Sequence, residues 1–138
     1  MRALVQRVRR ASVSIDGTQQ AAIGAGLLVL LGVAPDDDEA ITDRLAEKVR
    51  RLRIFEDAEG RMNESLGERE SLCVSQFTLY ADTNRGNRPS FTQAAPPELA
   101  ERLYERFCHA LDAKRGRFGA RMAVELVNDG PVTLLLEA

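Results

Sequence analysis

The order of apolar and polar positions predicts several short strands in the first third of the chain. In residues 12–15 serines alternate with Val13 and Ile15 ahead of Asp16-Gly17, which predicts a strand entering a hairpin turn. The unbroken apolar run Leu27 to Leu31 lies between glycines. Such a run is typical of a strand that is buried on both faces.

Two segments have the spacing of amphipathic helices. The first begins at Asp36, with acidic residues in its first turn and basic residues in its last turn near Arg51, as the helix dipole favours. A second helix is predicted from Pro96-Pro97, because proline suits the first turn, and Gly116 is a plausible stop. Both segments repeat apolar residues at helical spacing, which predicts one buried face for each.

The remaining apolar segments predict more strands. Residues 71–79 form one, and Met122 to Leu126 alternates as a second that turns at 128–131 into a third, Val132 to Leu136. Strands and helices mixed in this order predict an α+β fold, with a mixed or antiparallel, barrel-like sheet and two main helices packed on it. No linker or repeat interrupts residues 1–138, so a single domain is expected.

Composition narrows the possible function. With 138 residues, 44% hydrophobic and 29% charged, the chain is an ordinary globular protein, and its net charge of −2 argues against a uniformly basic nucleic-acid coat protein. No apolar run approaches the roughly 20 residues that span a bilayer. The two cysteines form no disulfide framework. These features predict a cytoplasmic protein without a membrane partner.

The single histidine excludes a multi-histidine metal site. His109 follows Cys108, but neighbouring helix residues point about 100° apart, so a surface histidine and a buried thiol are favoured over a nucleophile and its base. A metal site made from Cys73, Cys108 and His109 lacks recognisable ligand spacing. We therefore expect no metal and no cofactor.

Three other segments could carry chemistry. In Cys73 to Asp82, polar residues interrupt an apolar strand; they either face water or present N–H groups and hydroxyls to a reacting carbonyl at a pocket rim. Asn84 to Phe91 holds two arginines and no acid, which suits phosphate contacts, and Phe91 could stack or simply pack. Asn128 to Thr133 is by default a hairpin turn with a proline opening the outgoing strand.

Two of these segments resemble signature motifs. Ser75-Gln76-Phe77-Thr78-Leu79 and Asn128-Asp129-Gly130-Pro131-Val132-Thr133 are similar to the two motifs of the D-aminoacyl-tRNA deacylases. The resemblance runs nearly end to end, and departs locally at Glu70 and Cys73, where a small and an aliphatic residue would be usual. It also includes Gln6-Arg7-Val8, Gly24 to Val33, Arg53-Ile54-Phe55, Arg88-Pro89-Ser90-Phe91 and Phe118-Gly119-Ala120.

The resemblance implies a homodimeric cytoplasmic esterase that releases D-amino acids, and also glycine, from tRNA at sites on the dimer interface, without a cofactor. It implies that Gly130-Pro131 has a cis bond, enters the partner's pocket and rejects L-amino acids. Arg7 would hold that loop. Met122 would lie near the pocket, although a core position suits it equally. The resemblance further assigns substrate-binding positions to Pro89, Ser90 and Phe91.

For catalysis the resemblance points to Ser75, Gln76, Phe77 and Thr78. Backbone N–H groups near Phe77 and Thr78 would form the oxyanion hole. The attack is either assisted by the 2′-hydroxyl of the terminal adenosine or made by Thr78, and both routes stay open. The alternatives are a non-catalytic RNA-binding module, an esterase for small molecules, and a related editing enzyme that removes L-alanine. The retained motifs argue against the binding module, and intact Ser75-Gln76 argues against the editing enzyme. An esterase for small molecules would ignore the tRNA, so a deacylation assay separates it.

Charge is unevenly distributed along the sequence. Arginines at 2, 7, 9 and 10 have no acid among them, and Lys114, Arg115, Arg117 and Arg121 cluster later, whereas acids concentrate at 36–39 and 56–70. This separation allows a local basic groove for phosphates on a protein whose net charge is slightly negative.

Overall fold

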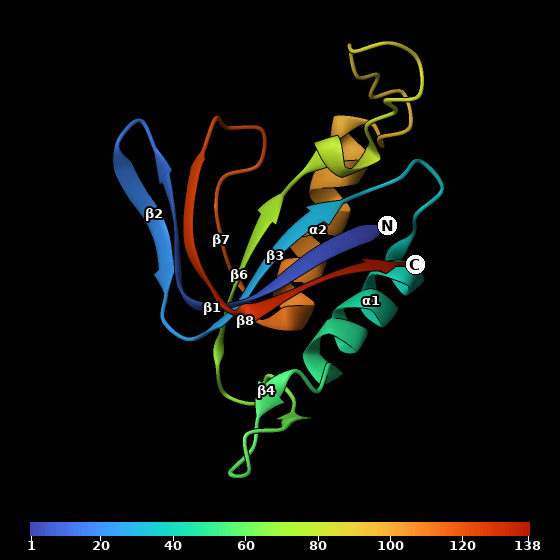
Figure 1. The fold of residues 1–138 in the computed structure, drawn as a ribbon. Helices are drawn as coiled ribbons and strands as arrows, with labels where there is room; N and C mark the ends of the chain where they lie inside the picture. The colour runs from blue at the N-terminus through green and yellow to red at the C-terminus, as the bar shows by residue number, and fades with distance from the viewer.

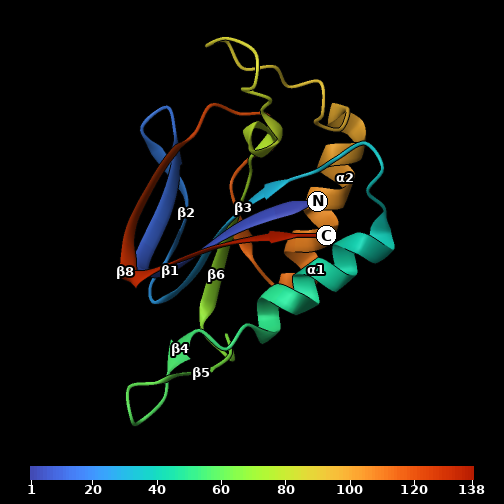
Figure 2. The same cartoon turned by 45° about the vertical axis from the view of Figure 1, so that its right-hand side comes forward.

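The computed structural model describes residues 1–138 as a curled mixed sheet with two helices on one side (Figures 1 and 2). The predicted α+β fold is confirmed. The elements are β1 (Arg2–Ile15), β2 (Thr18–Ile23), β3 (Gly26–Gly32), α1 (Glu39–Arg51), β4 (Phe55–Glu56), β5 (Met62–Glu64), β6 (Glu70–Ser75), the 3₁₀ helix η1 (Phe77–Tyr80), α2 (Pro97–Leu111), β7 (Lys114–Arg115) and β8 (Ala123–Glu137).

Strand β1 organises the sheet. One of its edges pairs with β3 over its first half and with β2 over its second half, while β8 pairs antiparallel along the other edge. Beyond β3 the order continues to β6 and β7 through parallel pairs. The hairpin predicted at Asp16-Gly17 is confirmed, with φ of 49° and 77°, as a two-residue turn between twisted strands requires.

The two outer strands of this order, β2 and β7, are joined by polar contacts that make the sheet barrel-like. Lys114 Nζ donates to the carbonyl of Ala22 at 2.9 Å and pairs with Glu70 at 2.8 Å. Glu70 also accepts from the N–H of Gly24 at 3.1 Å. The hydrogen bond from Lys114 lowers the pKa of Glu70. The unusual Glu70 therefore closes the seam of the sheet.

The core lies on both faces of the sheet. On β3, Leu27, Val29 and Leu31 contact the helices, whereas Leu28 belongs to a smaller cluster inside the curl. The prediction of a doubly buried strand is therefore confirmed. Between sheet and helix, the Tyr104 hydroxyl of α2 donates to the carbonyl of Cys73 at 2.9 Å. Burial raises the pKa of Tyr104, so the phenol stays a neutral donor.

The helix predictions are confirmed, with two boundaries corrected: α1 starts at Glu39 rather than at Asp36, and α2 stops before Gly116. α1 begins after Asp38, whose carboxylate accepts from the N–H of Ile41 at 2.8 Å. α2 ends at Leu111 instead of continuing to Gly116, because Asp112 adopts a left-handed conformation and its N–H bonds the last carbonyls. A short aspartate tolerates this geometry. Neither α1 nor α2 combines the length with the apolar composition that a membrane-spanning helix needs.

The strand predicted over 71–79 is wrong beyond Ser75. The N–H of Gln76 donates to the carbonyl of Leu31 at 2.7 Å, and β3 ends one residue later at Gly32. With no strand left to pair, the chain turns into η1. The short strands β4, β5 and β7 were not predicted, since two or three residues show no periodicity.

Candidate functional site

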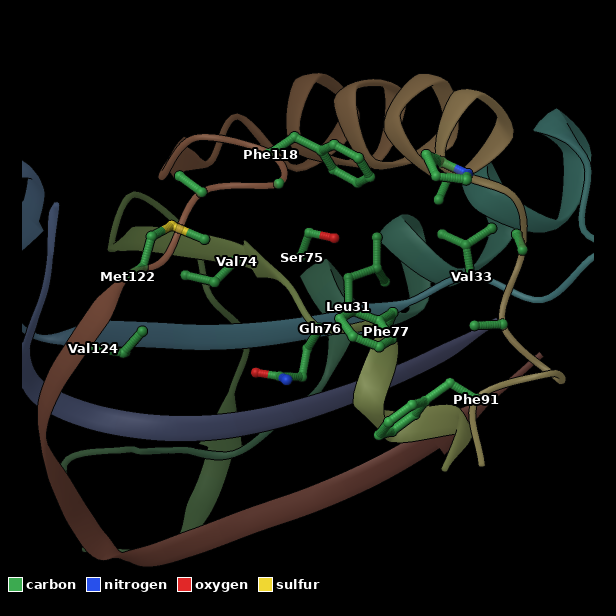
Figure 3. A pocket seen from close by; sticks show the side chains of 16 residues that line it. Leu31, Val33, Val74, Ser75, Gln76, Phe77, Phe91, Phe118, Met122 and Val124 are labelled. Atoms are coloured by element: carbon green, nitrogen blue, oxygen red, sulfur yellow. The ribbon is translucent and has the colours of Figure 1, made fainter. Parts of the chain in front are cut away.

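A cavity of about 600 Å³ lies where β6 ends, between the start of α2 and the loop that precedes β8 (Figure 3). Twelve of its 16 lining residues are hydrophobic and none is titratable. Ser75, Gln76 and Phe77 of the first motif line it, and Met122 faces them from the loop before β8. Its volume suits a small-molecule ligand.

The first motif is held rigidly at the rim of this cavity. The N–H of Gln76 donates to the carbonyl of Leu31 at 2.7 Å, which joins the motif to β3. Behind it, Arg2 donates to the carbonyl of Leu79 at 2.8 Å, and its guanidinium lies 4.6 Å from the ring centroid of Tyr80. Burial raises the pKa of Tyr80 to about 12. Arg2 therefore fixes η1 against β1, a role that the sequence did not reveal.

Two aromatic rings stand at the mouth of the cavity. The Phe77 and Phe91 centroids are 5.1 Å apart with planes at 74°, an edge-to-face pair. Phe77 is nevertheless 55% exposed. Phe91 follows a loop whose base is closed by two backbone hydrogen bonds between Asp82 and Ser90, at 2.7 and 2.9 Å. The mouth of the cavity therefore presents the exposed ring of Phe77, which packs against Phe91 at the end of a hydrogen-bonded loop.

The hydroxyl of Thr78 has one side-chain hydrogen bond, and its partner is an amide. Gln76 Nε2 donates to Thr78 Oγ1, so the hydroxyl accepts from an amide and contacts no base. His109 is exposed on α2 and does not line the cavity, and Cys108 is buried beside it. The prediction of a surface histidine and a buried thiol is confirmed. Burial raises the pKa of the Cys73 thiol, which stays protonated and packed in the core.

The second motif forms a bulge in β8 opposite Arg7. Between the pairs Gln6–Thr133 and Val8–Asn128, β1 contributes one residue and β8 contributes residues 129–132. We call residues 129–132 the β8 bulge. A bulge of this kind removes residues from the ladder and turns their groups outward.

Arg7 and Asn128 hold the β8 bulge. Arg7 is only 5% exposed; its Nε donates to the carbonyl of Asp129 at 3.2 Å and its Nη1 to the carbonyl of Ile54 at 2.6 Å. The carboxylate of Asp129 lies 3.3 Å from Arg7 Nε. The amide of Asn128 donates to the carbonyls of Arg7 and Val132, at 2.9 and 3.1 Å. The bulge is thus fixed by charge-assisted bonds from Arg7 and by neutral amide bonds from Asn128.

Comparison with known proteins shows the family of the whole chain. Residues 4–137 match the family model described as D-Tyr-tRNA(Tyr) deacylase. The D-aminoacyl-tRNA deacylase of Desulfatibacillum aliphaticivorans is 56% identical, covering 100% of this chain and 99% of the relative. That of Roseiflexus castenholzii is 57% identical over 100% and 92% of the two chains. The chain belongs to the D-aminoacyl-tRNA deacylase family. It is therefore an enzyme, a hydrolase that acts on an ester bond.

Two solved structures are similar to this chain over nearly its whole length. The c-Myc DNA Unwinding Element Binding Protein superimposes with a TM-score of 0.94 at 44% identity, covering 100% of this chain and 99% of that one. A probable eukaryotic D-amino acid tRNA deacylase superimposes with a TM-score of 0.85 at 18% identity, over 98% and 97% of the two chains. At 18% identity, this second likeness shows the shared fold alone.

Two expectations for the second motif are wrong. Asn128 to Pro131 is not a hairpin turn, because β8 continues through it from Ala123 to Glu137. The Gly130–Pro131 bond is trans, since the structure contains no cis peptide. The chain departs from the ladder through Gly130, whose φ of +106° only glycine adopts readily, so the excursion occurs without a cis bond.

The structure separates the expected site residues into two groups. Ser75, Gln76, Phe77, Phe91 and Met122 line the cavity, and Thr78 follows them in η1. The residues Arg7, Gly130 and Pro131 form the β8 bulge region and do not line the cavity. Pro89 and Ser90 lie on the loop leading to the mouth.

Sequence reasoning missed part of the cavity wall. Phe118, Gly119 and Ala120 line the cavity from the loop before β8, and Ala94 and Ala95 line it from the segment before α2. Phe118, Gly119 and Ala120 occur in the family resemblance. The only sign in the sequence that they line a ligand cavity was their apolar character within a loop. The alanines gave no signal, because small residues in loops have many explanations.

Proposed function

We propose that the enzyme hydrolyses the ester between a D-amino acid, or glycine, and the 3′ end of tRNA, and leaves L-aminoacyl-tRNA intact. The observation that carries this proposal is the cavity itself: the first motif lies at an apolar pocket without a titratable side chain. Such a pocket can select by shape and hydrogen bonding. A cytoplasmic location follows from this substrate.

We infer a homodimer in which the β8 bulge of one subunit closes the cavity of the other. Gly130 and Pro131 are exposed and serve no site in their own chain. The outer edge of β8 pairs with no strand, and Leu134 and Leu135 on it are 38% and 54% exposed. Exposed leucines beside an unpaired edge favour burial against a second copy.

Selection against L-amino acids would follow from the placement of this bulge. Gly130 and Pro131 lack ladder partners, so their backbone groups can face a neighbouring pocket. Carbonyls placed where an L side chain must lie would exclude it by contact and desolvation. Glycine has no side chain to exclude, so glycyl-tRNA would also be hydrolysed. This selection uses the trans bond as found.

For the chemistry, we propose that water attacks the ester carbonyl carbon. The new bond is water oxygen to carbonyl carbon, the ester carbon–oxygen bond breaks, and the ribose oxygen leaves and takes a proton. Backbone N–H groups of Phe77 and Thr78, at the cavity rim, would stabilise the oxyanion. Thr78 is a poor nucleophile because a hydroxyl needs an adjacent base. The neighbouring 2′-hydroxyl of tRNA would assist instead.

A deacylation assay with D-Tyr-tRNA, L-Tyr-tRNA, Gly-tRNA and L-Ala-tRNA tests this proposal. We expect release of D-tyrosine and glycine, and no release of either L-amino acid. Equal release of the D and L tyrosyl forms would contradict the proposal. Release of L-alanine would indicate the alternative editing activity.

The remaining alternatives give other results in the same assay. A nucleic-acid-binding module would bind the tRNA and release nothing. An esterase for small molecules would hydrolyse D-tyrosine methyl ester at least as fast as D-Tyr-tRNA. We expect the methyl ester to be the much poorer substrate, because it lacks the nucleotide that fills the mouth.

A further inference from the structure

Four arginines around the cavity have no partner within the chain. Arg85 and Arg88 lie on the Asp82–Ser90 loop, and Arg117 and Arg121 lie on the loop before β8. None makes an ion pair or a side-chain hydrogen bond, although most basic side chains here do one or the other. We call these four residues the arginine rim.

The two loops that carry the arginine rim frame one cavity. Phe91, directly after the first loop, lines it from one side, and Phe118 to Ala120 of the second loop line it from another (Figure 3). Both loops lie at the end of the sheet opposite to β4 and β5 (Figures 1 and 2). In the second loop, Arg117 and Arg121 are exposed while Phe118 and Ala120 between them are half-buried.

The electrostatics of these loops differ from those of the neighbouring basic residues. No acid occurs from Thr83 to Pro97 or from Ala113 to Val124. Lys114 and Arg115, which share the second segment, are neutralised by Glu70 and Glu105 at 2.8 and 2.7 Å. Within these two segments, the positive charge that stays unpaired therefore belongs to the arginine rim, on the loops that frame the cavity.

We propose that the arginine rim binds the phosphates of the single-stranded 3′ end of tRNA and guides the ester into the cavity. The inference rests on the proposed function, which places the terminal ribose at that mouth. Arginine suits phosphate because its planar fork donates two parallel hydrogen bonds. The phosphates of the last nucleotides necessarily lie within a few residues of the ester, so they are the anions within reach of these loops.

Double charge reversals test the rim. R85E/R88E and R117E/R121E should each weaken binding of D-Tyr-tRNA, and raise its KM, roughly tenfold at 0.1 M salt. The slope of log Kd against log salt should fall by about 0.7 for each single-strand phosphate that the variant no longer binds. The matched control is R44E/K48E on α1, where both side chains are exposed, neither has a partner and neither lines the cavity.

A substrate without phosphate separates this inference from the proposed function. On 3′-(D-tyrosyl)adenosine the rim variants should perform like the control variant, because no phosphate is present. An equal loss on tRNA and on this nucleoside ester would show that the loops are merely distorted, and would overturn the rim. The proposal would also be overturned if the rim variants bound tRNA with the same affinity and the same salt slope as the control variant. If wild-type enzyme released nothing from D-Tyr-tRNA, the proposed function would fail, yet the binding and salt arms would still report on the rim.

Discussion

The cavity and the β8 bulge are fixed in opposite ways. The cavity rim is built mostly from neighbours: the first motif continues directly from core strand β6, its Gln76 N–H donates to the carbonyl of Leu31, and Arg2 adds one bond to the carbonyl of Leu79. The bulge is built against regular structure, and Arg7 and Asn128 reach across the sheet to hold it open. The first arrangement needs little beyond the packing of adjacent strands. The second buries charged and polar groups, and their desolvation cost must be offset by the hydrogen bonds that they make.

The two regions also differ in what they lack. The cavity has shape and aromatic surface but no group that reads chirality, while the bulge presents backbone to the outside and has no pocket of its own. Each region supplies what the other is missing. The comparison therefore supports a site shared between two chains, and it predicts that damage to either region removes activity by a different route.

The largest effect is expected for Arg7→Ala. It leaves the carbonyls of Ile54 and Asp129 without their donor in a buried place, which should cost about 3 kcal/mol in the free energy of unfolding. Because the bulge is then unanchored, D-Tyr-tRNA deacylation should fall roughly 100-fold even in the folded fraction. Urea unfolding and single-turnover rates measure the two effects. If Arg7→Lys were as good as wild type, charge alone, rather than the forked geometry, would hold the bulge.

Gly130→Ala should also cost roughly 100-fold in rate, with a smaller loss of about 1–2 kcal/mol in stability. A Cβ at Gly130 would lie 2.3 Å from Nη2 of Arg7, which cannot move away without losing its bonds, and the φ of +106° is strained for alanine. Gly60→Ala is the matched control: its φ is +76° and its Cβ meets nothing within 4 Å. Similar rates for the two variants would show that backbone strain, not bulge placement, matters.

Removing the open aromatic face should have a moderate effect. Phe77→Ala leaves the backbone N–H in place but deletes the ring at the cavity mouth, so KM for D-Tyr-tRNA should rise about tenfold, as loss of one stacked base predicts, while kcat changes little. Steady-state kinetics separate the two terms. A fall confined to kcat would mean that the ring positions the reacting ester rather than a base.

Thr78→Val should change the rate by less than about threefold, because the hydroxyl has no base and water makes the attack. Valine keeps the shape and removes only the oxygen. Single-turnover rates with fold and tRNA affinity checked would decide the point. A loss of several thousandfold would instead identify Thr78 as the nucleophile.

The smallest effect concerns neither region. On α1 and α2, Asp43 accepts two hydrogen bonds from Arg106, at 2.8 and 2.7 Å, and these lower the pKa of Asp43. A lowered folded-state pKa gives stability that is present above 3.8, the ordinary value, and is lost as pH falls through the lowered one. Asp43→Asn should therefore melt slightly below wild type at pH 7 and converge with it in acid. Deacylation should be unchanged.

Local patterns predicted much of the fold. Asp16-Gly17, the run Leu27 to Leu31 and the charged ends of α1 each encode their structure within a few neighbours, and all three are confirmed. Boundaries set by distant partners were not predictable in this way. β6 ends because its partner β3 ends. The β8 bulge is held by Arg7, which lies 122 residues from Asp129 in the sequence.

The candidate site shows the same division. Ser75 to Phe77 and Phe91 were identified from motif residues, and the structure brings them to one cavity. The geometry of Gly130-Pro131 was expected to be cis and is trans, because the extended course of β8 and the permissive φ of Gly130 accommodate the bulge. The arginine rim could not be predicted from the sequence. Only the ion pairs in the structure show that Lys114 and Arg115 are neutralised, whereas Arg117 and Arg121 have no acidic partner.

Complementation between two damaged subunits tests the shared site most directly. Gly130→Ala disables the bulge, and Ala94→Trp fills the cavity; each homodimer should be nearly inactive on D-Tyr-tRNA. A heterodimer isolated through two different tags would hold one doubly damaged site and one intact site, so it should regain about half of the wild-type rate per dimer. A heterodimer as inactive as its parents, or a protein that stays monomeric while fully active, would contradict a site built from two chains.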